Sequence, residues 1–380
     1  MFQVKSRYLE KPVIEDLEKK MVFLGGPRQV GKTTLALKLL GAKNDEHPAY
    51  LNWDNPLLRA SLIKGEIPTS ESLIVLDEIH KYKAWRNLVK GFFDVHRRSC
   101  RFLITGSARL DYYRRGGDSL QGRYHYYRFH PLSLYEINEK PTLTDFNHLL
   151  HYGGFPEPFF SSDDREYKRW QKERLSRVVY EDLAGLEKVR EISSLEVLMS
   201  ALPERVGSPL SIANLREDLS VAFETAEHWV QILERLYYCF RISPYGSTKI
   251  KGVKKEKKLY LWDWSQIPSP GARLENMVAS NLLKYCHFHE DYNGEKMELK
   301  FLRDITKREI DFVVLKNNKP EFAVECKTGE SAAAKNIAYF SERTNIPLFY
   351  QVHLGKKNVE VAKIRTRILP FTEFSKILKI

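Results

Sequence analysis

Short apolar runs and helical segments alternate along the first third of the chain. Residues 21–24, 72–76 and 101–105 are almost continuously apolar, which is typical of strands that are buried on both faces of a parallel sheet. Residues 34–40 repeat leucine and alanine at helical spacing. This alternation predicts an α/β domain at the N-terminus.

Helical periodicity then dominates the chain up to about residue 237. Tryptophan, leucine and valine recur at helical spacing across residues 163–191, which predicts a helical connector. Three further helices are predicted at residues 194–205, 211–219 and 222–237. Two strand patterns follow at residues 239–242 and 258–262, joined by a loop that contains proline and glycine. Three helices followed by a hairpin predict a winged helix.

From residue 270 the pattern changes to one helix and then strands. Residues 273–279 begin an amphipathic helix, and residues 308–314 and 321–327 have strand patterns. A chain of 380 residues is long enough for two or three domains, because single cores stop growing at about 250 to 300 residues.

The loop between the first strand and the first helix carries the clearest chemistry. It is a complete G-x-x-x-x-G-K-[ST] phosphate-binding loop in its required context. Its backbone N–H groups would surround the β-phosphate, Lys32 would reach the β- and γ-phosphates, and the Thr33 hydroxyl would ligate Mg²⁺. The predicted nucleotide-binding residues are Gly26, Pro27, Arg28, Gln29, Val30, Gly31, Lys32, Thr33 and Thr34.

Two carboxylates end the second apolar run. Asp77 and Glu78 follow residues 72–76, at the edge where α/β sheets place their ligands. We expect Asp77 to hold Mg²⁺ through water and Glu78 to polarise the attacking water. ATP and Mg²⁺ are therefore the predicted cofactors, and ATP hydrolysis is the predicted activity.

These motifs resemble an AAA-type ATPase family of bacteria and archaea whose members carry a C-terminal domain of unknown function. The resemblance covers nearly the whole chain and rests on residues 26–33, 73–78, 103–107, 120–124 and 131–133. It implies that Ser107, with Thr105 as the rival, senses the γ-phosphate. It also implies that Arg123 stabilises charge on the transferring phosphate, from across a subunit contact. The alternative for Arg123 is a buried salt bridge.

A helix-breaking segment lies at residues 151–156. Its Gly-Phe-Pro piece resembles the G-x-P motif of signal-transducing ATPases related to AAA proteins. In those families the proline packs against the adenine ring from a small helical lid, so the resemblance implies an adenine contact for Pro156. The alternative is an ordinary turn.

The predicted winged helix has two interpretations. If it binds DNA, residues 225–235 would enter the groove and the hairpin lysines would lie on phosphates. The glutamates at positions 224, 227 and 234 repel phosphate, which favours a protein–protein hinge instead. The lysines in question are Lys249, Lys251, Lys254, Lys255, Lys257 and Lys258.

The C-terminal helix and strands carry Glu, Asp and Glu-x-Lys in an order that resembles the PD-(D/E)xK nuclease fold. Alternation along the last strand places Glu325 and Lys327 on one face. Asp311 and Glu325 could then hold Mg²⁺, with Glu275 assisting, while Lys327 orients or activates water. Ile310 stands where proline would precede the first acid. The alternative is a surface-exposed acidic–basic pair in a domain kept for protein contacts.

Composition adds three constraints. The net charge of +12 and a pI near 9.3 are compatible with a nucleic-acid partner. The four cysteines lack C-x-x-C spacing, which argues against a zinc site and for a reducing compartment. The absence of a long apolar run and of a signal segment predicts a cytoplasmic protein without a membrane partner.

The expected architecture is α/β in four parts. These are a P-loop AAA-type ATPase core (1–145), a helical lid and connector (146–191), a winged-helix domain (192–265) and a PD-(D/E)xK-like domain (266–380). The leading prediction is an ATP-hydrolysing switch that controls the nuclease-like domain. The alternatives are an ATP-regulated, metal-dependent DNA nuclease and a non-hydrolysing scaffold ordered by nucleotide. DNA, a protein partner and further copies of the chain stay open as partners.

Overall fold

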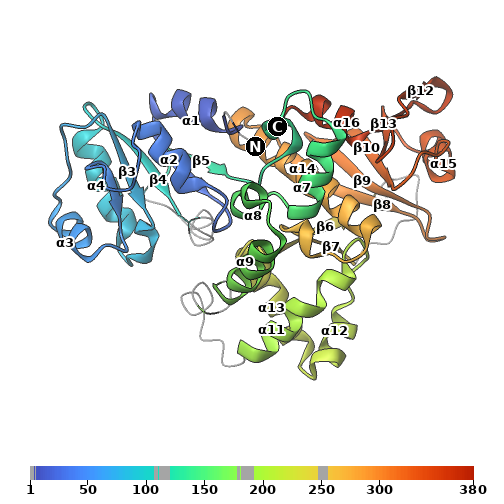
Figure 1. Ribbon diagram of the computed structural model, residues 1–380, viewed down its shortest axis with the longest axis horizontal. Coiled ribbons are helices and arrows are strands. Elements are labelled where there is room, and N and C mark those ends of the chain that lie inside the picture. The colour runs from blue at the N-terminus through green and yellow to red at the C-terminus, as the bar shows by residue number, and fades with distance from the viewer. Residues whose placement is uncertain are drawn as a thin grey trace. The chain divides into compact units, whose positions relative to one another are not determined.

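The structure is a computed structural model that describes residues 4, 6–106, 110, 120–177, 180, 192–246 and 256–380. The chain divides into two compact units, one formed by Lys5–His130 and the other by Met1–Val4 together with Pro131–Ile380. We call them the N-terminal unit and the C-terminal unit (Figure 1). No helix within the described ranges is long and apolar enough to cross a membrane.

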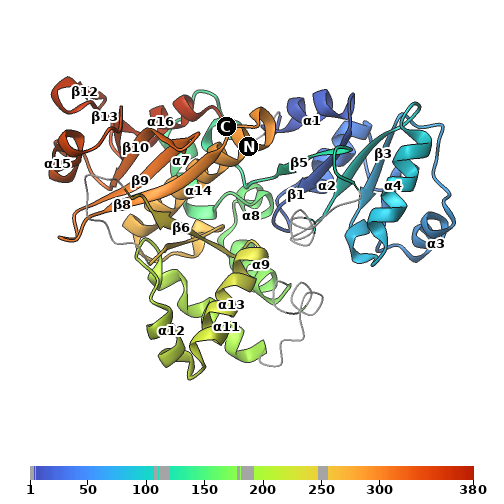
Figure 2. The ribbon, with the colours of Figure 1, turned by 180° about the vertical axis from the view of Figure 1, so that it is seen from behind.

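The N-terminal unit is built on a five-stranded parallel sheet of order β2-β3-β4-β1-β5. Figure 2 labels β1, β3 and β5 of this sheet. Its strands are β1 (Met21–Gly25), β2 (Tyr50–Asn52), β3 (Leu73–Asp77), β4 (Arg101–Thr105) and β5 (Tyr124–Arg128). Its helices include α1 (Glu10–Leu17), α2 (Lys32–Leu40), α3 (Pro56–Lys64) and α4 (Trp85–His96). β1 is buried along its whole length, as is β3 beyond its first residue. The three predicted strands and the predicted helix are therefore confirmed.

The C-terminal unit contains an eight-stranded mixed sheet of order β12-β13-β11-β10-β9-β8-β6-β7. Its strands are β6 (Cys239–Pro244), β7 (Lys258–Leu261), β8 (Met297–Arg303), β9 (Glu309–Lys316), β10 (Lys319–Lys327), β11 (Phe349–His353), β12 (Val359–Val361) and β13 (Thr366–Pro370). The strands β8, β9 and β10 are antiparallel neighbours, whereas β11 runs parallel to β10. Two helices alternate with these strands along the chain: α14 (Pro270–Asn293) precedes β8, and α15 (Lys335–Arg343) joins β10 to β11.

The described part of the middle of the chain is helical, as predicted, whereas residues 178, 179 and 181–191 of the predicted connector lie outside the described residues. Its helices include α6 (Leu134–Ile137), α7 (Leu143–Tyr152), α8 (Pro156–Ser161), α9 (Asp164–Arg177), α11 (Ile192–Ala201), α12 (Ile212–Leu219) and α13 (Phe223–Arg235), and α16 (Phe371–Leu378) ends the chain. Both views show α11, α12 and α13 gathered together beside the β6–β7 hairpin (Figures 1 and 2). The hairpin also extends the C-terminal sheet, because Ser243 of β6 pairs with Lys300 of β8. The sheet is thus continuous across the predicted boundary at residues 265 and 266.

Helix α14 holds the segment at residues 131–136, which follows the N-terminal unit along the chain. The buried Lys284 donates to the carbonyl oxygen of Pro131 and to the hydroxyl oxygen of Ser133, both at 3.1 Å. It also forms an ion pair with Glu136, and Glu136 completes a capping box with Ser133 at the start of α6. The Pro-Leu-Ser sequence at residues 131–133 therefore has a structural role within this unit.

Candidate functional site

The phosphate-binding loop joins β1 to α2 at the edge where the parallel strands end. Gly26 has a φ of +146°, and a Cβ there would lie 2.4 Å from the carbonyl oxygen of Phe129, so only glycine fits. Gln29 and Gly31 also have positive φ, at 60° and 98°. Helix α2 begins at Lys32, so its first-turn N–H groups, which lack helical partners, lie at the loop.

The Lys32 ammonium lies inside this loop. It donates to the carbonyl oxygens of Gly26 and Pro27 at 3.0 and 2.7 Å, and the residue is 8% exposed. These contacts hold the positive charge over the loop. The contact of Lys32 with the β- and γ-phosphates stays a prediction.

The Asp77 carboxylate is the centre of a buried hydrogen-bond cluster. Thr33 Oγ1 donates to Asp77 Oδ2 at 3.2 Å, and Thr105 Oγ1 donates to Oδ1 at 2.5 Å. Thr33 and Asp77 are thus adjacent oxygen donors at the mouth of the loop. Hydroxyl and carboxylate oxygens suit Mg²⁺, which is usually held by few protein groups together with water and substrate phosphates. The two residues therefore fit the predicted metal.

Tyr50 is a member of this cluster that the sequence analysis missed. It lies on β2, and its hydroxyl donates to Asp77 Oδ2. Burial and the charge of Asp77 raise the pKa of the Tyr50 phenol, which keeps the phenol protonated as a donor. Strand β2 has only three residues, so no long apolar run marks it. A tyrosine beside a buried carboxylate becomes visible only once the strand order is known.

Glu78 turns away from β3 into a short 3₁₀ turn. Its φ is 55°, and its N–H donates to the carbonyl oxygen of Thr105 at 3.0 Å. Its Oε2 lies 3.4 Å from Lys81 Nζ and 3.7 Å from His80 Nε2. Burial and the charge of Asp77 raise the pKa of Glu78. A higher pKa makes the carboxylate a stronger proton acceptor, which suits the predicted role toward water.

Only one of the two candidates for γ-phosphate sensing, Thr105, lies among the described residues. Thr105 ends β4 in register with Asp77 and donates its hydroxyl to it. Ser107 lies outside the described residues, so its sensing role stays a prediction. The Thr105 hydroxyl thus orients the carboxylate that is predicted to hold the metal, and its sensing role also stays a prediction.

Arg123 lies where the strands of the same sheet begin, whereas the phosphate loop lies where they end. It immediately precedes β5, and its carbonyl oxygen accepts from the N–H of Met21 at the start of β1. Its Nε donates to Asp94 Oδ1 at 3.0 Å, with 35% of the arginine side chain exposed. The predicted alternative of a buried salt bridge is therefore wrong in one respect, because this ion pair is half-buried at most. A role in phosphate chemistry requires the loop of another copy.

Packing within the C-terminal unit explains the Gly-Gly-Phe sequence at residues 153–155, which is part of the predicted lid motif at residues 151–156. A Cβ on Gly153 would lie 2.8 Å from Asp263 Oδ1, and one on Gly154 would lie 2.6 Å from Trp264 Cη2. Phe155 is fully buried, and the Arg174 guanidinium lies 4.1 Å from its ring centre. The half-buried Pro156 begins α8, and its predicted adenine contact stays a prediction.

The predicted groove helix is α13, and its acids are partly neutralised. Arg241 of β6 donates to Glu227 at 2.9 and 3.0 Å and to Glu234 at 3.0 and 2.8 Å. The expectation that Lys258 contacts DNA phosphate is wrong, because this residue is 1% exposed. Four other hairpin lysines lie outside the described residues: Lys249, Lys251, Lys254 and Lys255.

Of the predicted C-terminal acids, Glu325 is buried and Glu275 and Asp311 are partly buried, and all three lie close to lysines. Lys258 Nζ lies 3.3 Å from Glu275 Oε1 and 3.8 Å from Asp311 Oδ1. Lys327 Nζ lies 2.6 Å from Glu325 Oε1. Glu325 is 5% exposed, whereas 39% of the Lys327 side chain is exposed, so the alternative of a surface-exposed acidic–basic pair is wrong for the acid. Glutamate and lysine do share one face of β10, as predicted.

The same carboxylates do not form a ready metal site. Within the described ranges, no group of three or more aspartate, glutamate, histidine or cysteine side chains is arranged to hold a metal ion. Asp311 Oδ2 accepts from the N–H of Cys326 at 2.8 Å, and Glu275 accepts from the hydroxyl of Tyr260 at 2.8 Å. Burial and the charge of Asp311 raise the pKa of Glu275 to about 7 and that of Glu325 to about 8. Metal binding by Glu275, Asp311 and Glu325 stays a prediction.

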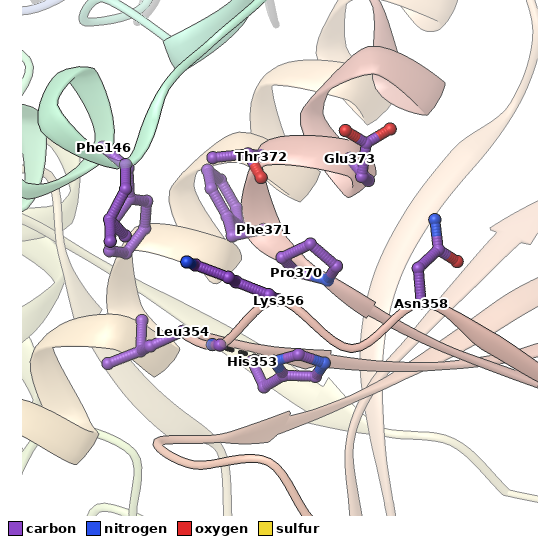
Figure 3. A pocket seen from close by; sticks show the side chains of 11 residues that line it. Phe146, His353, Leu354, Lys356, Asn358, Pro370, Phe371, Thr372 and Glu373 are labelled. Atoms are coloured by element: carbon purple, nitrogen blue, oxygen red, sulfur yellow. Dashed lines mark hydrogen bonds between the residues drawn. The ribbon is translucent and has the colours of Figure 1, made fainter.

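A cavity of about 360 Å³ lies elsewhere in the C-terminal unit, between α7, the end of β11 and the start of α16. Figure 3 shows Phe146 and Phe371 on its wall, with the Lys356 side chain extending toward them. The ring nitrogens of His353 are engaged by the backbone of residues 355 and 357, both at 2.9 Å. We assign no role to this apolar and basic cavity.

Comparison with known families agrees with the geometry of the N-terminal unit. A family described as "AAA domain" matches residues 18–138. Two domains of unknown function, DUF8612 and DUF4143, match residues 143–267 and 270–374. Together with the phosphate loop and the Asp77 cluster, the first match defines an AAA-type P-loop ATPase domain.

Similar proteins extend over most of the chain but are themselves uncharacterized. A protein of Mycobacterium tuberculosis is 25% identical over 245 residues, which is 64% of this chain and 54% of that protein. The chain therefore spans about half the length of this relative. A protein of Methanocaldococcus jannaschii is 24% identical over 377 residues, which is 89% of this chain and 82% of that protein.

Comparison with solved structures gives two matches of low similarity. One is the Thermotoga maritima RuvB Holliday junction branch migration motor, with 17% identity, 63% of this chain and 90% of that chain covered, and a TM-score of 0.31. The other is the Aeropyrum pernix ORC1 protein in complex with DNA, with 11% identity, coverages of 74% and 94%, and a TM-score of 0.32. Scores this low carry no argument about function.

Proposed function

We propose that the protein is a Mg²⁺-dependent ATPase whose nucleotide state controls its C-terminal unit. The observation that carries the hydrolytic part is the Asp77 cluster, in which the hydroxyl of Thr33 from the phosphate loop contacts a buried carboxylate from β3. A scaffold that only binds nucleotide does not need Glu78 as a base beside this cluster. The ATPase hypothesis accounts for both acids.

Each side chain of this site has a separate task in the proposed reaction. Lys32 and the N–H groups of the loop bind and orient the phosphates, while Thr33 and Asp77 would hold the metal. When bound, Mg²⁺ supplies positive charge that offsets the charge developing on the phosphate oxygens. Glu78 orients water for in-line attack and receives its proton, which requires the carboxylate to exchange its contact with Lys81 for the water.

The control part of the proposal rests on the composite architecture. One chain joins an ATPase domain to a C-terminal unit with its own buried ion pairs and its own sheet. We propose that ATP binding and hydrolysis alter how this unit meets a partner. Pro156 as an adenine contact and Ser107 as a γ-phosphate sensor would report the nucleotide state.

Specific observations also support the second candidate, an ATP-regulated DNA nuclease. The succession α14–β8–β9–β10–α15–β11, with three antiparallel strands and a fourth parallel to the third, supports kinship with the PD-(D/E)xK fold. The cluster of α11–α13 with the β6–β7 hairpin supports a winged helix. The lysines paired with the acids argue against metal-dependent cleavage, so we rank this candidate second.

ATP turnover by the Glu78→Gln variant tests the leading proposal. We expect nucleotide binding to persist and hydrolysis to fall by about a hundredfold or more, because glutamine cannot accept the proton from water. Glu66→Gln is the matched control, since Glu66 is an exposed acid of the same unit, and it should leave turnover unchanged. Lys32→Ala should abolish turnover. Unchanged hydrolysis in Glu78→Gln would refute the assignment of this base.

A further inference from the structure

Lys258 is a buried cation in the C-terminal unit that ATP hydrolysis does not use. It is the first residue of β7 and is 1% exposed. Its ammonium lies 5.6 Å from the centre of the Phe301 ring, so one side of its surroundings is apolar. A lysine this deeply buried stays charged only with close anionic partners, and the acids around it raise its pKa.

Three carboxylates surround this ammonium. Glu275 comes from α14, and its Oε1 lies 3.3 Å from Lys258 Nζ. Glu309 and Asp311 come from β9, where residues two apart share one face of the strand. Glu309 forms the shortest of the three ion pairs, and Asp311 Oδ1 lies 3.8 Å away. The lysine therefore lies between a helix and a strand that both carry predicted metal ligands.

A fourth carboxylate extends the cluster toward β10. Glu325 is nine-tenths buried or more, and its Oε1 accepts from Lys327. Its Oε2 has no hydrogen-bond partner among the described residues, and the charge of Asp311 acts on it. Glu309 also pairs with Arg303 at 3.4 Å. The positive charge that these acids need is thus provided by side chains of the chain itself.

A divalent cation does not fit this arrangement. It would need carboxylate oxygens at about 2.0 to 2.6 Å, and the oxygens of Glu275 and Asp311 are already turned to the Lys258 ammonium. Two positive centres cannot share those oxygens in a buried site without strong repulsion. Metal binding and the observed position of Lys258 are therefore mutually exclusive.

We propose that the Lys258 ammonium takes the place that a divalent cation would need among Glu275, Glu309 and Asp311, which closes the C-terminal unit to metal-dependent cleavage. The lysine fastens the β6–β7 hairpin to α14 and β9, so it joins two segments that the sequence analysis assigned to separate domains. This inference concerns the C-terminal unit alone and does not depend on ATP hydrolysis.

Calorimetric titration of the nucleotide-free full chain with Mn²⁺ tests the inference. The parent protein should show no binding that depends on Asp311, so the parent and Asp311→Asn should give the same isotherm. Lys258→Met removes the ammonium and keeps an apolar chain of similar length. It should gain a Mn²⁺ site at least tenfold tighter than any in the parent, and the Lys258→Met/Asp311→Asn double variant should lose it.

Lys316→Met is the matched control. Lys316 also lies on β9 and pairs with a glutamate, Glu295, at 2.7 Å, but outside this cluster. This control should gain no site. Thermal unfolding gives a second readout, because Mn²⁺ should raise the midpoint of Lys258→Met by several degrees and leave the parent unchanged.

Two results would overturn the inference. One is Mn²⁺ binding by the parent protein that disappears in Asp311→Asn, since the metal would then displace the ammonium. The other is a folded Lys258→Met that gains no site. If Lys258→Met does not fold in the absence of metal, recovery of folding by Mn²⁺ supports the inference. If Mn²⁺ gives no recovery, Lys258→Gln and the comparison of the parent with Asp311→Asn decide the question.

Discussion

Tyr50 helps to orient the carboxylate that is predicted to hold the metal. Its hydroxyl, the Thr33 hydroxyl and the Thr105 hydroxyl all donate to the Asp77 carboxylate. Three donors on one buried carboxylate fix the direction of both oxygens. If Thr33 turns toward a bound Mg²⁺, Tyr50 and Thr105 still hold Asp77 in position.

Tyr50→Phe should therefore weaken the use of Mg²⁺ more than the binding of ATP. Removal of the hydroxyl deletes one hydrogen bond to Asp77, which is worth about 0.5 to 1.5 kcal/mol, so we expect kcat to fall about two- to tenfold. The Mg²⁺ concentration that gives half-maximal turnover should rise, while the KM for ATP changes little.

Tyr82→Phe is the control for this prediction, because Tyr82 stacks on Trp53 in the same unit and its hydroxyl makes no hydrogen bond with Asp77. Turnover measured across a Mg²⁺ series distinguishes the two variants. A Tyr50→Phe protein with the parent's Mg²⁺ dependence would show that Thr33 and Thr105 alone orient Asp77.

Secondary-structure elements are the scale at which much of the molecule could be predicted. Local apolar runs predict the strands at residues 21–24, 72–76 and 101–105. The spacing of glycine, lysine and threonine predicts the phosphate loop. The Tyr50–Asp77 and Lys258–Glu275 contacts join residues 27 and 17 positions apart. Such contacts depend on strand order and on the position of the hairpin, which local patterns do not encode.

The turn between α7 and α8 provides a prediction about packing. A Cβ on Gly154 would lie 2.6 Å from Trp264 Cη2 and 2.7 Å from the carbonyl oxygen of Leu132. Gly154→Ala should therefore destabilise the C-terminal unit by about 1 to 3 kcal/mol, the usual cost of overpacking. Gly246→Ala is the control, because a Cβ there meets nothing within 4 Å. Equal thermal midpoints for the two variants would contradict this account of the lid motif.

The ion pairs of Arg241 with Glu227 and Glu234 give a second prediction at the scale of secondary-structure elements. Its side chain is 5% exposed and holds Glu227 and Glu234, whose side chains are 29% and 27% exposed. Arg241→Met should lower the stability of α13 and its neighbours by about 1 to 3 kcal/mol, less than for a fully buried pair because water reaches the two acids. Thermal unfolding followed by the fluorescence of Trp229 on α13 measures this. Arg216→Met, which alters a pair that is largely exposed, should have little effect.

At the scale of the whole molecule, the position of Arg123 decides whether the ATPase acts alone or as an assembly. Arg123 precedes β5 at one edge of the parallel sheet, and the phosphate loop follows β1 at the other edge. The length of strand between these edges is about 13 Å, from roughly 3.3 Å per residue. The arginine therefore cannot reach the phosphates bound by its own loop. If it contributes to turnover, it must do so in a neighbouring subunit.

Mixing two inactive variants tests this requirement directly. Lys32→Ala lacks a working phosphate loop but keeps Arg123, whereas Arg123→Ala keeps the loop but lacks the arginine. If Arg123 acts in trans, each variant alone should be nearly inactive, and a mixture should regain a fraction of parental turnover, because some loops then face an intact arginine. Turnover per subunit of the parent should also rise with protein concentration.

Arg98→Ala, which alters an exposed arginine of the same unit, is the control and should stay active alone. Full activity of Arg123→Ala alone would rule out the proposed role, whereas low activity that mixing does not restore, together with a lowered thermal midpoint, would assign Arg123 to the ion pair with Asp94.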